Sequence, residues 1–225
     1  MYAEFTRRFP TIRSLARAPL ADVLRAWQGL GYNRRAKMLR EAAKEIVARH
    51  AGRVPRDVRA LEALPGVGPY TARAIAAFAW NADEVFIETN IRTAVIRHFF
   101  TPKKNTPIYG CVLDAQIASV LAWVLPHGRA REWYAALMDY GAYLKRSGVK
   151  LNPRSAHYTK QVRFAGSARE ARGTVLRGLL AGPASEASLT KALGPSRASQ
   201  MKKALAALIQ EGLVVRTGKQ FSLPR

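Results

Sequence analysis

The sequence predicts a mainly α-helical protein that ends in a small α+β domain. Three observations support this prediction. Apolar residues recur every three to four positions through most of the first 145 residues, as in the segment 34–48, and this spacing is typical of helices with one buried face. No stretch before residue 165 shows the alternation that is typical of a half-buried strand. After that point, three helical segments are followed by two short apolar runs around Thr217-Gly218, which indicates a hairpin.

The charge balance points to a polyanionic partner. Lysine and arginine number 37 against 15 aspartate and glutamate, so the 225-residue chain carries a formal net charge of +22. Such a chain repels itself, and nucleic acid is the partner that most often compensates for this. No apolar run approaches the roughly 18 residues that a membrane span needs. Cys111 is the only cysteine, which excludes intrachain disulfides and Cys-based zinc or iron–sulfur sites, and we expect a cytoplasmic, nucleoid-associated protein.

The elements follow from the periodicity and from glycine and proline punctuation. Gly29 and Gly31 end the first expected helix, and Pro65 ends the third. Thr71 is expected to begin the fourth helix. The helices expected in the first part of the chain are residues 21–27, 34–48, 55–64, 71–80, 90–100, 112–124 and 131–145.

The composition changes after residue 145. Eight basic residues and only one acid, Glu170, lie between residues 145 and 172, which is typical of a charged linker or extended arm. The helices expected beyond it are residues 169–180, 188–193 and 196–211, and the strands 213–215 and 220–223. Three helices followed by a β-hairpin describe a winged helix. We therefore expect a helical domain over residues 1–166 and a winged-helix domain over residues 167–225.

The segment Leu64-Pro65-Gly66-Val67-Gly68-Pro69-Tyr70-Thr71-Ala72 lies between two expected helices. Gly66 and Gly68 permit a positive φ and leave the backbone bare. A turn of this kind presents backbone amides and a helix N-terminus to a phosphate without reading the base sequence. An ordinary turn between two helices uses glycine for the same steric reason, so a G-x-G alone is a weak signal. The residues of this segment that we expect to contact DNA are Leu64, Gly66, Val67, Gly68 and Thr71.

This segment resembles the helix–hairpin–helix of the DNA glycosylase superfamily that includes endonuclease III and the MutY-type adenine glycosylases. The resemblance extends over roughly residues 2–146 and is specific because several motifs keep the same order and spacing. These motifs are Phe9-Pro10-Thr11, Val23-Leu24, Trp27-Gln28-Gly29-Leu30-Gly31-Tyr32 before Arg35, Gly52 to Pro55, Ile87-Glu88-Thr89-Asn90-Ile91, and Met138-Asp139-Tyr140-Gly141-Ala142. The resemblance implies a helix–hairpin–helix glycosylase fold for the first domain.

The resemblance also implies a reaction. Enzymes of this family flip a damaged or mispaired nucleotide out of the duplex and cut its N-glycosidic bond. The sugar becomes oxocarbenium-like, and a carboxylate beside C1′ stabilises it. Glu88 matches that carboxylate, although the family has aspartate there, and the extra methylene shifts the group by roughly an ångström, which can cost on the order of a hundredfold in rate. The alternative role of Glu88 is to cap the helix that contains Asn90.

Two further positions bear on the chemistry. Asn90 matches the family's asparagine two residues after the carboxylate, which helps to position the sugar, and its alternative role is a helix cap. Tyr70 occupies the position of the Schiff-base lysine of bifunctional glycosylase–lyases. Because tyrosine cannot form that imine, we expect a monofunctional enzyme that uses water. A tyrosine there is compatible with both adenine and thymine mismatch glycosylases, so it does not identify the base.

Tyr32 matches a tyrosine that wedges into the base stack in MutY-type enzymes, and its alternative role is a core residue that supports the turn. Arg34 and Arg35 follow closely and are candidate phosphate contacts. Lys145 and Arg146 stand about where the family's iron–sulfur loop would begin, but none of its cysteines is present. We therefore expect no iron–sulfur cluster and no metal ligand, and phosphate contacts from this basic segment instead. Whether a monovalent cation lies at the hairpin stays open.

Two other departures from the family concern function. The sequence begins partway into the family pattern, and the preceding helices, which in MutY-type enzymes carry the glutamate that protonates adenine, have no counterpart in it. Either the true start lies upstream or this form lacks that acid. The winged-helix tail also replaces the domain that recognises oxidised guanine, and Arg197, Lys202 and Lys203 on its third helix are candidate DNA contacts. Winged helices also mediate protein contacts.

The function that the sequence favours is a monofunctional DNA glycosylase of base excision repair, without lyase activity, that removes a mispaired base. Adenine is favoured, with thymine or uracil as the alternative base. The expected partner is double-stranded DNA with a mismatched or damaged base, bound by a monomer and away from any membrane. A catalytically inactive duplex-binding protein is the alternative from another class, and a regulator whose winged helix sets specificity is a third.

Overall fold

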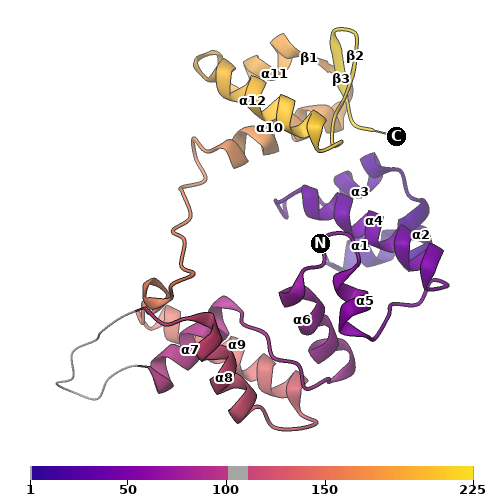
Figure 1. Cartoon of the computed structure of the whole chain (residues 1–225). Helices are drawn as coiled ribbons and strands as arrows, with labels where there is room; N and C mark the ends of the chain where they lie inside the picture. The colour runs from indigo at the N-terminus through magenta and orange to yellow at the C-terminus, as the bar shows by residue number, and fades with distance from the viewer. Residues whose placement is uncertain (1, 101–110, 225) are drawn as a thin grey trace. The chain divides into compact units, whose positions relative to one another are not determined.

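The computed structural model describes residues 2–100 and 111–224 (Figure 1). These residues form two compact units. The first unit contains the described residues of Met1–Val54, Leu64–Gly66 and Val162–Arg225, and the second those of Pro55–Ala63 and Val67–Gln161. Both units are mainly helical, and the described part of the chain contains a three-stranded antiparallel sheet near its C-terminal end. The expected mainly α fold class with a small α+β part is therefore confirmed.

The first unit begins with four helices, α1 (Tyr2–Arg8), α2 (Ile12–Arg17), α3 (Leu20–Ala26) and α4 (Arg34–Arg49). The expected helices at 21–27 and 34–48 correspond to α3 and α4. Sequence reasoning missed α1 and α2, which are too short to show two full periods of apolar residues. A local signal for α2 was present, because Thr11 and Ser14 form a reciprocal capping box at its start.

The C-terminal part of the first unit has the winged-helix order of elements. It comprises α10 (Ala168–Ala181), β1 (Ala184–Ser185), α11 (Glu186–Leu193), the 3₁₀ turn η2 (Pro195–Arg197), α12 (Ala198–Gln210), β2 (Val215–Thr217) and β3 (Gln220–Ser222). The sheet order is β1-β3-β2, with Phe221 of β3 opposite both Ala184 and Arg216. The strand expected at 213–215 begins two residues later, because Leu213 and Val214 are fully buried core residues instead.

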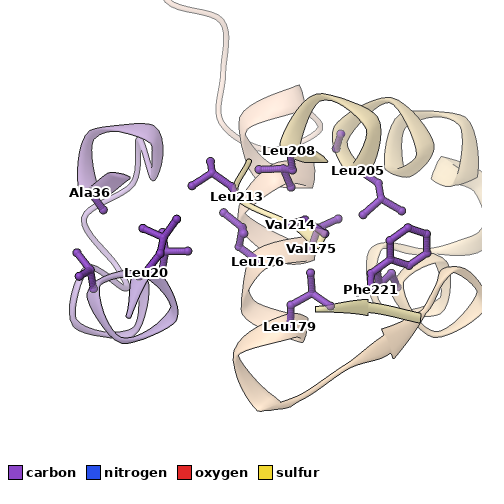
Figure 2. Close-up of a cluster of buried hydrophobic side chains, with 14 of the residues drawn as sticks. Leu20, Ala36, Val175, Leu176, Leu179, Leu205, Leu208, Leu213, Val214 and Phe221 are labelled. Carbon is purple, nitrogen blue, oxygen red and sulfur yellow. The ribbon is translucent and has the colours of Figure 1, made fainter. Parts of the chain in front are cut away.

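One hydrophobic core extends through the first unit. It contains residues of α3 and α4, such as Leu20 and Ala36, together with residues from α10 to β3, such as Leu176, Leu213 and Phe221 (Figure 2). Polar contacts accompany this core, because the Lys37 ammonium on α4 donates to the backbone carbonyl of Glu211. The Glu211 carboxylate in turn accepts two hydrogen bonds, of 2.6 and 2.9 Å, from the Arg172 guanidinium on α10. The domain boundary at residues 166/167 stays a prediction, although α10 does begin at Ala168, with Ser167 as its N-cap.

The second unit comprises α5 (Val58–Glu62), α6 (Pro69–Trp80), α7 (Thr89–Phe99), α8 (Asp114–Val124), α9 (Ala130–Arg146) and the 3₁₀ turn η1 (Asn152–Arg154) (Figure 1). The helix expected at 55–64 is shorter at both ends. It begins at Val58 because Asp57 caps its start by accepting from the Ala60 amide at 2.8 Å. The fourth expected helix begins at Pro69 and not at Thr71. Proline suits the first helical position because its missing N–H would have no partner there.

The core of the second unit lies among α6, α7, α8 and α9. Its largest fully buried side chains include Ile91 and Ile96 of α7, Ile117 and Leu121 of α8, and Tyr134 of α9. Buried side chains therefore cover the inner face of α7 along most of its length. This packing fixes the N-terminal turn of α7, which carries two of the candidate catalytic residues. None of the helices described here is long and apolar enough to cross a membrane.

Candidate active site

The candidate carboxylate Glu88 is the N-cap residue of α7. Its backbone is extended, with φ −102° and ψ 161°, and its side chain folds back so that Oε2 accepts from the Asn90 backbone amide at 2.5 Å. This is the capping role that the sequence left open beside catalysis. The two roles are compatible, since the cap bond engages one carboxylate oxygen and holds the half-buried group in place. The positive end of the α7 macrodipole also favours a negative charge at this position.

The side chain of Asn90 lies against α9. Its Oδ1 accepts a hydrogen bond of 2.6 Å from the Lys145 ammonium. The structure therefore places Glu88, Asn90 and Lys145 in one connected group, through the backbone amide and the side chain of the same asparagine. Burial lowers the pKa of Lys145, the nearby charge of Glu88 raises it, and Arg92 lowers it further. The net effect is a lowered pKa, with burial as its largest cause.

The chain keeps α7 and α9 unusually close at this point. Gly141 of α9 is buried, and a Cβ built on it would overlap the Asn90 carbonyl oxygen and lie 2.8 Å from the Asn90 Cα. A helix-interior glycine costs roughly 1 kcal/mol relative to alanine, so the close approach gives this glycine a structural reason. Two residues further along α7, Arg92 forms a bidentate ion pair with Asp114 of α8, with N–O distances of 2.8 to 3.1 Å.

The hairpin geometry confirms one expectation from the sequence and corrects another. Gly66 has φ +77°, the left-handed conformation that glycine adopts without strain, and a Cβ there would lie 2.5 Å from Met38 Cβ. Gly68 does not have a positive φ. It is extended, with φ −94° and ψ 176°, because it serves as the N-cap of α6. As a residue without a side chain, Gly68 leaves the amides of the first turn of α6 without a side-chain cap.

An ion pair connects the two helices on either side of the hairpin. Arg73 of α6 pairs with Glu62 of α5 at 2.9 Å and lies 3.6 Å from Glu84. Tyr70, at the start of α6, packs edge-on against Phe86, with ring centroids 5.9 Å apart. Phe86 is buried and precedes Glu88 by two residues, so this contact joins the start of α6 to the segment that carries the carboxylate.

The side chain of Tyr32 is exposed to solvent, and its backbone is in the left-handed region. It is 55% exposed and has φ +47°, which is uncommon for a residue with a Cβ. A hydrogen bond stabilises the turn that contains Tyr32, because the Trp27 indole N–H donates to the Gly31 carbonyl at 2.9 Å. The Arg35 guanidinium lies 4.9 Å from the centroid of the Tyr32 ring. The residue is therefore not part of the core, and a base-stacking role stays a prediction.

The other predicted DNA contacts differ in how exposed they are. Arg34 and Arg146 are exposed, and Val67 and Thr71 are half-buried. Leu64 is only 4% exposed, so any contact that it makes with DNA comes from its backbone. In the winged-helix part, Arg197 is held by Glu170 at 3.0 Å and by Gln200 at 2.8 Å, so its guanidinium is committed within the fold. Lys203 is exposed, and Lys202 is paired with Glu186 at 3.3 Å.

Sequence reasoning missed two parts of this site. It assigned Lys145 to DNA phosphate and gave no sign that its ammonium bonds Asn90, because a single lysine in a basic stretch carries no positional signal. Gly141 was predicted only as part of a motif, and its close contact with α7 was not expected. A signal for the second was present, since a glycine inside a strongly periodic helix lowers its stability and therefore indicates a packing or functional reason.

Residues 1–129 match the HhH-GPD superfamily of base excision DNA repair proteins. The chain belongs to this superfamily. This membership confirms the resemblance stated from the motifs, and with it the prediction that the protein is a DNA glycosylase of base excision repair whose partner is DNA.

Several proteins named as DNA glycosylases are similar to this HhH-GPD chain. The adenine DNA glycosylase of Mycobacterium tuberculosis (strain CDC 1551 / Oshkosh) is 36% identical over 244 residues, covering 100% of this chain and 79% of the relative. That of Mycolicibacterium smegmatis (strain ATCC 700084 / mc(2)155) is 36% identical over 234 residues, covering 96% and 78%. The thymine/uracil-DNA glycosylase of Methanothermobacter thermautotrophicus is 27% identical over 145 residues, 64% of each chain. The solved structure of a thermostable thymine-DNA glycosylase has the same fold over 70% of this chain and 74% of its own, with a TM-score of 0.54 and 24% identity.

The residues present do not fit the iron–sulfur cluster of cluster-containing members of this fold. Such a cluster needs several cysteine thiolates, and Cys111 is the only cysteine of the sequence. Where the cluster loop would begin, Lys145 bonds Asn90 instead. Within residues 2–100 and 111–224, no group of three or more histidine, cysteine, aspartate or glutamate side chains is placed to hold a metal ion.

Proposed function

We propose that this glycosylase is monofunctional and removes adenine from a mispair by hydrolysis. The observation that carries the proposal is the carboxylate of Glu88, held at the N-terminus of α7 beside Asn90. By the resemblance of its motif, Glu88 matches the family's catalytic carboxylate. The full-length similarity to two mycobacterial adenine DNA glycosylases supports adenine as the base.

The chemistry follows from the charge that develops on the sugar. As the bond between C1′ and the base nitrogen breaks, its electron pair leaves with the adenine, which takes up one proton. The sugar becomes cationic, and a preorganised carboxylate next to it lowers the barrier. Water then adds its oxygen to C1′ and loses a proton. Glu88 stabilises the cationic sugar, and Asn90 helps to position it.

Glutamate in place of aspartate is accommodated by the cap bond. The longer side chain does not extend freely, because Oε2 is tied back to the Asn90 amide at 2.5 Å. A carboxylate held in this way loses little entropy when the substrate arrives, and a fixed orientation is what electrostatic stabilisation needs. We therefore propose that Glu88 replaces the family aspartate functionally.

We propose that the protein has no lyase activity because Tyr70 stands where bifunctional enzymes have a lysine. A phenol cannot form the imine that a lysine forms at this position, and its ring is packed against Phe86. DNA is held by the hairpin backbone at Gly66 and Gly68, by the start of α6, and by the exposed cations Arg34, Arg35 and Arg146. Tyr32 fills the gap left by the flipped nucleotide. We propose that the protein acts as a monomer on nucleoid DNA.

A thymine or uracil mismatch glycosylase is the second candidate, favoured by the similarity to the Methanothermobacter enzyme. Single-turnover excision on four labelled duplexes, holding A:8-oxoG, A:G, T:G and U:G, separates the two. Each sample is divided, and one half is treated with alkali. Strand cleavage of the adenine duplexes only after alkali supports the proposal, and cleavage without alkali contradicts the monofunctional mechanism. Cleavage confined to T:G or U:G favours the second candidate, and binding without any excision indicates an inactive DNA-binding protein.

A further inference from the structure

Among the described residues, the Lys145 ammonium is the hydrogen-bond donor to the Asn90 side-chain oxygen, at 2.6 Å. An ammonium has three donors and no acceptor. The atom of Asn90 that faces it must therefore be the carbonyl oxygen, and the amide NH₂ must point the other way. Lys145 thus selects one of the two flip states of the Asn90 carboxamide.

This selection determines what Asn90 offers to a substrate. With its oxygen occupied, the side chain presents two N–H donors. The DNA backbone around a flipped nucleotide presents acceptors, namely phosphate and sugar oxygens. A carboxamide turned the other way would place its oxygen against those oxygens. Asn90 and Glu88 are also joined through the Asn90 backbone amide, so a shift of Asn90 also shifts the carboxylate.

We propose that Lys145 is a positioning residue for Asn90 and Glu88, and not one of the phosphate contacts that its charge suggests. The inference rests on the proposed function of Glu88 as the catalytic carboxylate. It places a lysine of α9 in the active site, at the point where the family's iron–sulfur loop would otherwise begin.

The sign of one effect distinguishes positioning from simple electrostatics. The transition state carries positive charge on the sugar, and Lys145 is a cation bonded to Asn90, whose backbone amide bonds Glu88. By charge alone, removal of this cation would favour the transition state and raise the rate. If Lys145 acts by positioning, its removal lowers the rate in spite of this gain. A phosphate contact gives a third pattern, in which affinity and its salt dependence change.

The test compares Lys145→Met, which keeps the length of the side chain without charge or donor, with Lys145→Arg. We expect Lys145→Met to lower the single-turnover rate at saturating enzyme by roughly tenfold to a hundredfold, the scale of a small misplacement. Its Kd for the duplex should change much less than the rate does, and the slope of log Kd against log salt should stay at the wild-type value because no contact between a cation and a phosphate is lost. Lys145→Arg keeps a charged donor and should restore part of the rate. The same change at an exposed lysine of α11, Lys191→Met, controls for loss of one surface charge.

Arg146→Met provides the contrast. Arg146 is exposed and follows Lys145 directly, and as a phosphate contact its loss should weaken binding and reduce the salt slope by about one. If Lys145→Met instead behaves like Arg146→Met, or if its rate rises, the proposal is wrong. A thermal melt checks that Lys145→Met folds. If it does not fold, Lys145→Gln takes its place, since a neutral amide cannot select the flip state of Asn90.

The pH profile gives an independent readout. The groups whose charges act on Lys145 are Glu88 and Arg92, and Arg92 is paired with Asp114, which also lies 3.4 Å from His157. Because burial lowers the pKa of Lys145, its ammonium is lost at a lower pH than that of an ordinary lysine. The excision rate should fall there, and Lys145→Arg should remove this alkaline decline because arginine does not titrate. A rate that rises as Lys145 deprotonates contradicts positioning.

A measurement that needs no turnover separates this inference from the proposed function. The side-chain NH₂ resonances of Asn90, assigned with Asn90→Asp, report the state of the carboxamide in the free protein. We expect Lys145→Met to shift them and to speed their exchange with solvent, while Lys191→Met leaves them unchanged. If the wild-type protein excises no base, the proposed function fails, but these resonances still decide the Lys145–Asn90 relationship. Resonances unchanged by Lys145→Met overturn the inference.

Discussion

Gly141 of α9 lies directly against the backbone carbonyl of Asn90 at the start of α7, with no room for a methyl group between them. Gly141→Ala should therefore move the first turn of α7, and with it Glu88. We expect a loss of roughly 1–3 kcal/mol in the free energy of unfolding and at least a tenfold fall in excision. Chemical denaturation and single-turnover kinetics measure the two effects. Gly173→Ala on α10 is the matched control, because nothing lies within 4 Å of a Cβ there and alanine favours a helix.

The two hairpin glycines should respond differently to the same change. A Cβ on Gly66 meets Met38 at 2.5 Å and the residue has φ +77°, so Gly66→Ala should destabilise the protein and weaken DNA binding. Gly68 has φ −94° and open space around it, so Gly68→Ala should change the free energy of unfolding by less than roughly 0.5 kcal/mol. It should still weaken binding, because a methyl group would separate the backbone from a phosphate. A Gly68→Ala protein that binds duplex DNA like the wild type would contradict phosphate binding by this hairpin.

The aromatic ring of Tyr32, and not its hydroxyl, should determine its contribution to the excision rate. Because the side chain is exposed and lies under the Arg35 guanidinium, Tyr32→Phe keeps both the stacking surface and the cation–π contact. Tyr32→Ala removes about 1–3 kcal/mol of stacking with a base, so excision should fall by roughly tenfold or more. The measurement is the single-turnover rate of each variant on the same mispaired duplex. Equal rates for the Ala and Phe variants would show that Tyr32 does not enter the base stack.

Alkaline pH should weaken the fold through Tyr134. Burial raises the pKa of this fully buried tyrosine to about 12, whereas an unfolded tyrosine titrates near the ordinary value of 10.0. Tyr134 therefore stays protonated to a higher pH in the folded state than in the unfolded state. The free energy of unfolding falls as the pH rises from about 10 to about 12. The loss is on the order of 2–3 kcal/mol.

Tyr134→Phe tests this prediction. The variant keeps the packing of the ring, loses the hydrogen bond of 3.0 Å from the hydroxyl to the Glu84 carbonyl, and has nothing to titrate. Its urea unfolding free energy should be lower at neutral pH and should decline less steeply above pH 10. Parallel declines in the two proteins would exclude Tyr134 as the cause.

Much of the fold could be predicted because its helices have strong periodicity and clear stop signals. α4 and α9 are long enough to show an apolar face, and α6 follows two glycines and a proline. The exact ends were less predictable. They depend on caps such as Asp57 and Gly68. Asp57 caps α5 with its own side chain, whereas Gly68 caps α6 without a side chain that could signal the start of the helix.

The candidate site was predictable as a set of positions and not as a set of contacts. Glu88, Asn90 and Tyr70 were found because their motif has fixed spacing on one short segment or turn. The bond between Lys145 and Asn90 joins residues 55 positions apart, and it exists because α7 and α9 approach at Gly141. No periodicity within either helix encodes that approach. Gly141 signals a packing constraint on α9, but only the packing of the second unit shows that the neighbour is α7.

The central claim is that Glu88 is the carboxylate of a hydrolytic adenine excision. The most direct test measures free adenine released from an A:8-oxoG duplex in a single turnover, by the wild-type protein and by Glu88→Gln. Glutamine keeps the size of the side chain and can still accept the cap bond from the Asn90 amide, so DNA affinity should be unchanged. We predict that the wild type releases adenine and leaves a strand that breaks only in alkali, while Glu88→Gln releases none. Adenine release by Glu88→Gln at the wild-type rate would contradict the account.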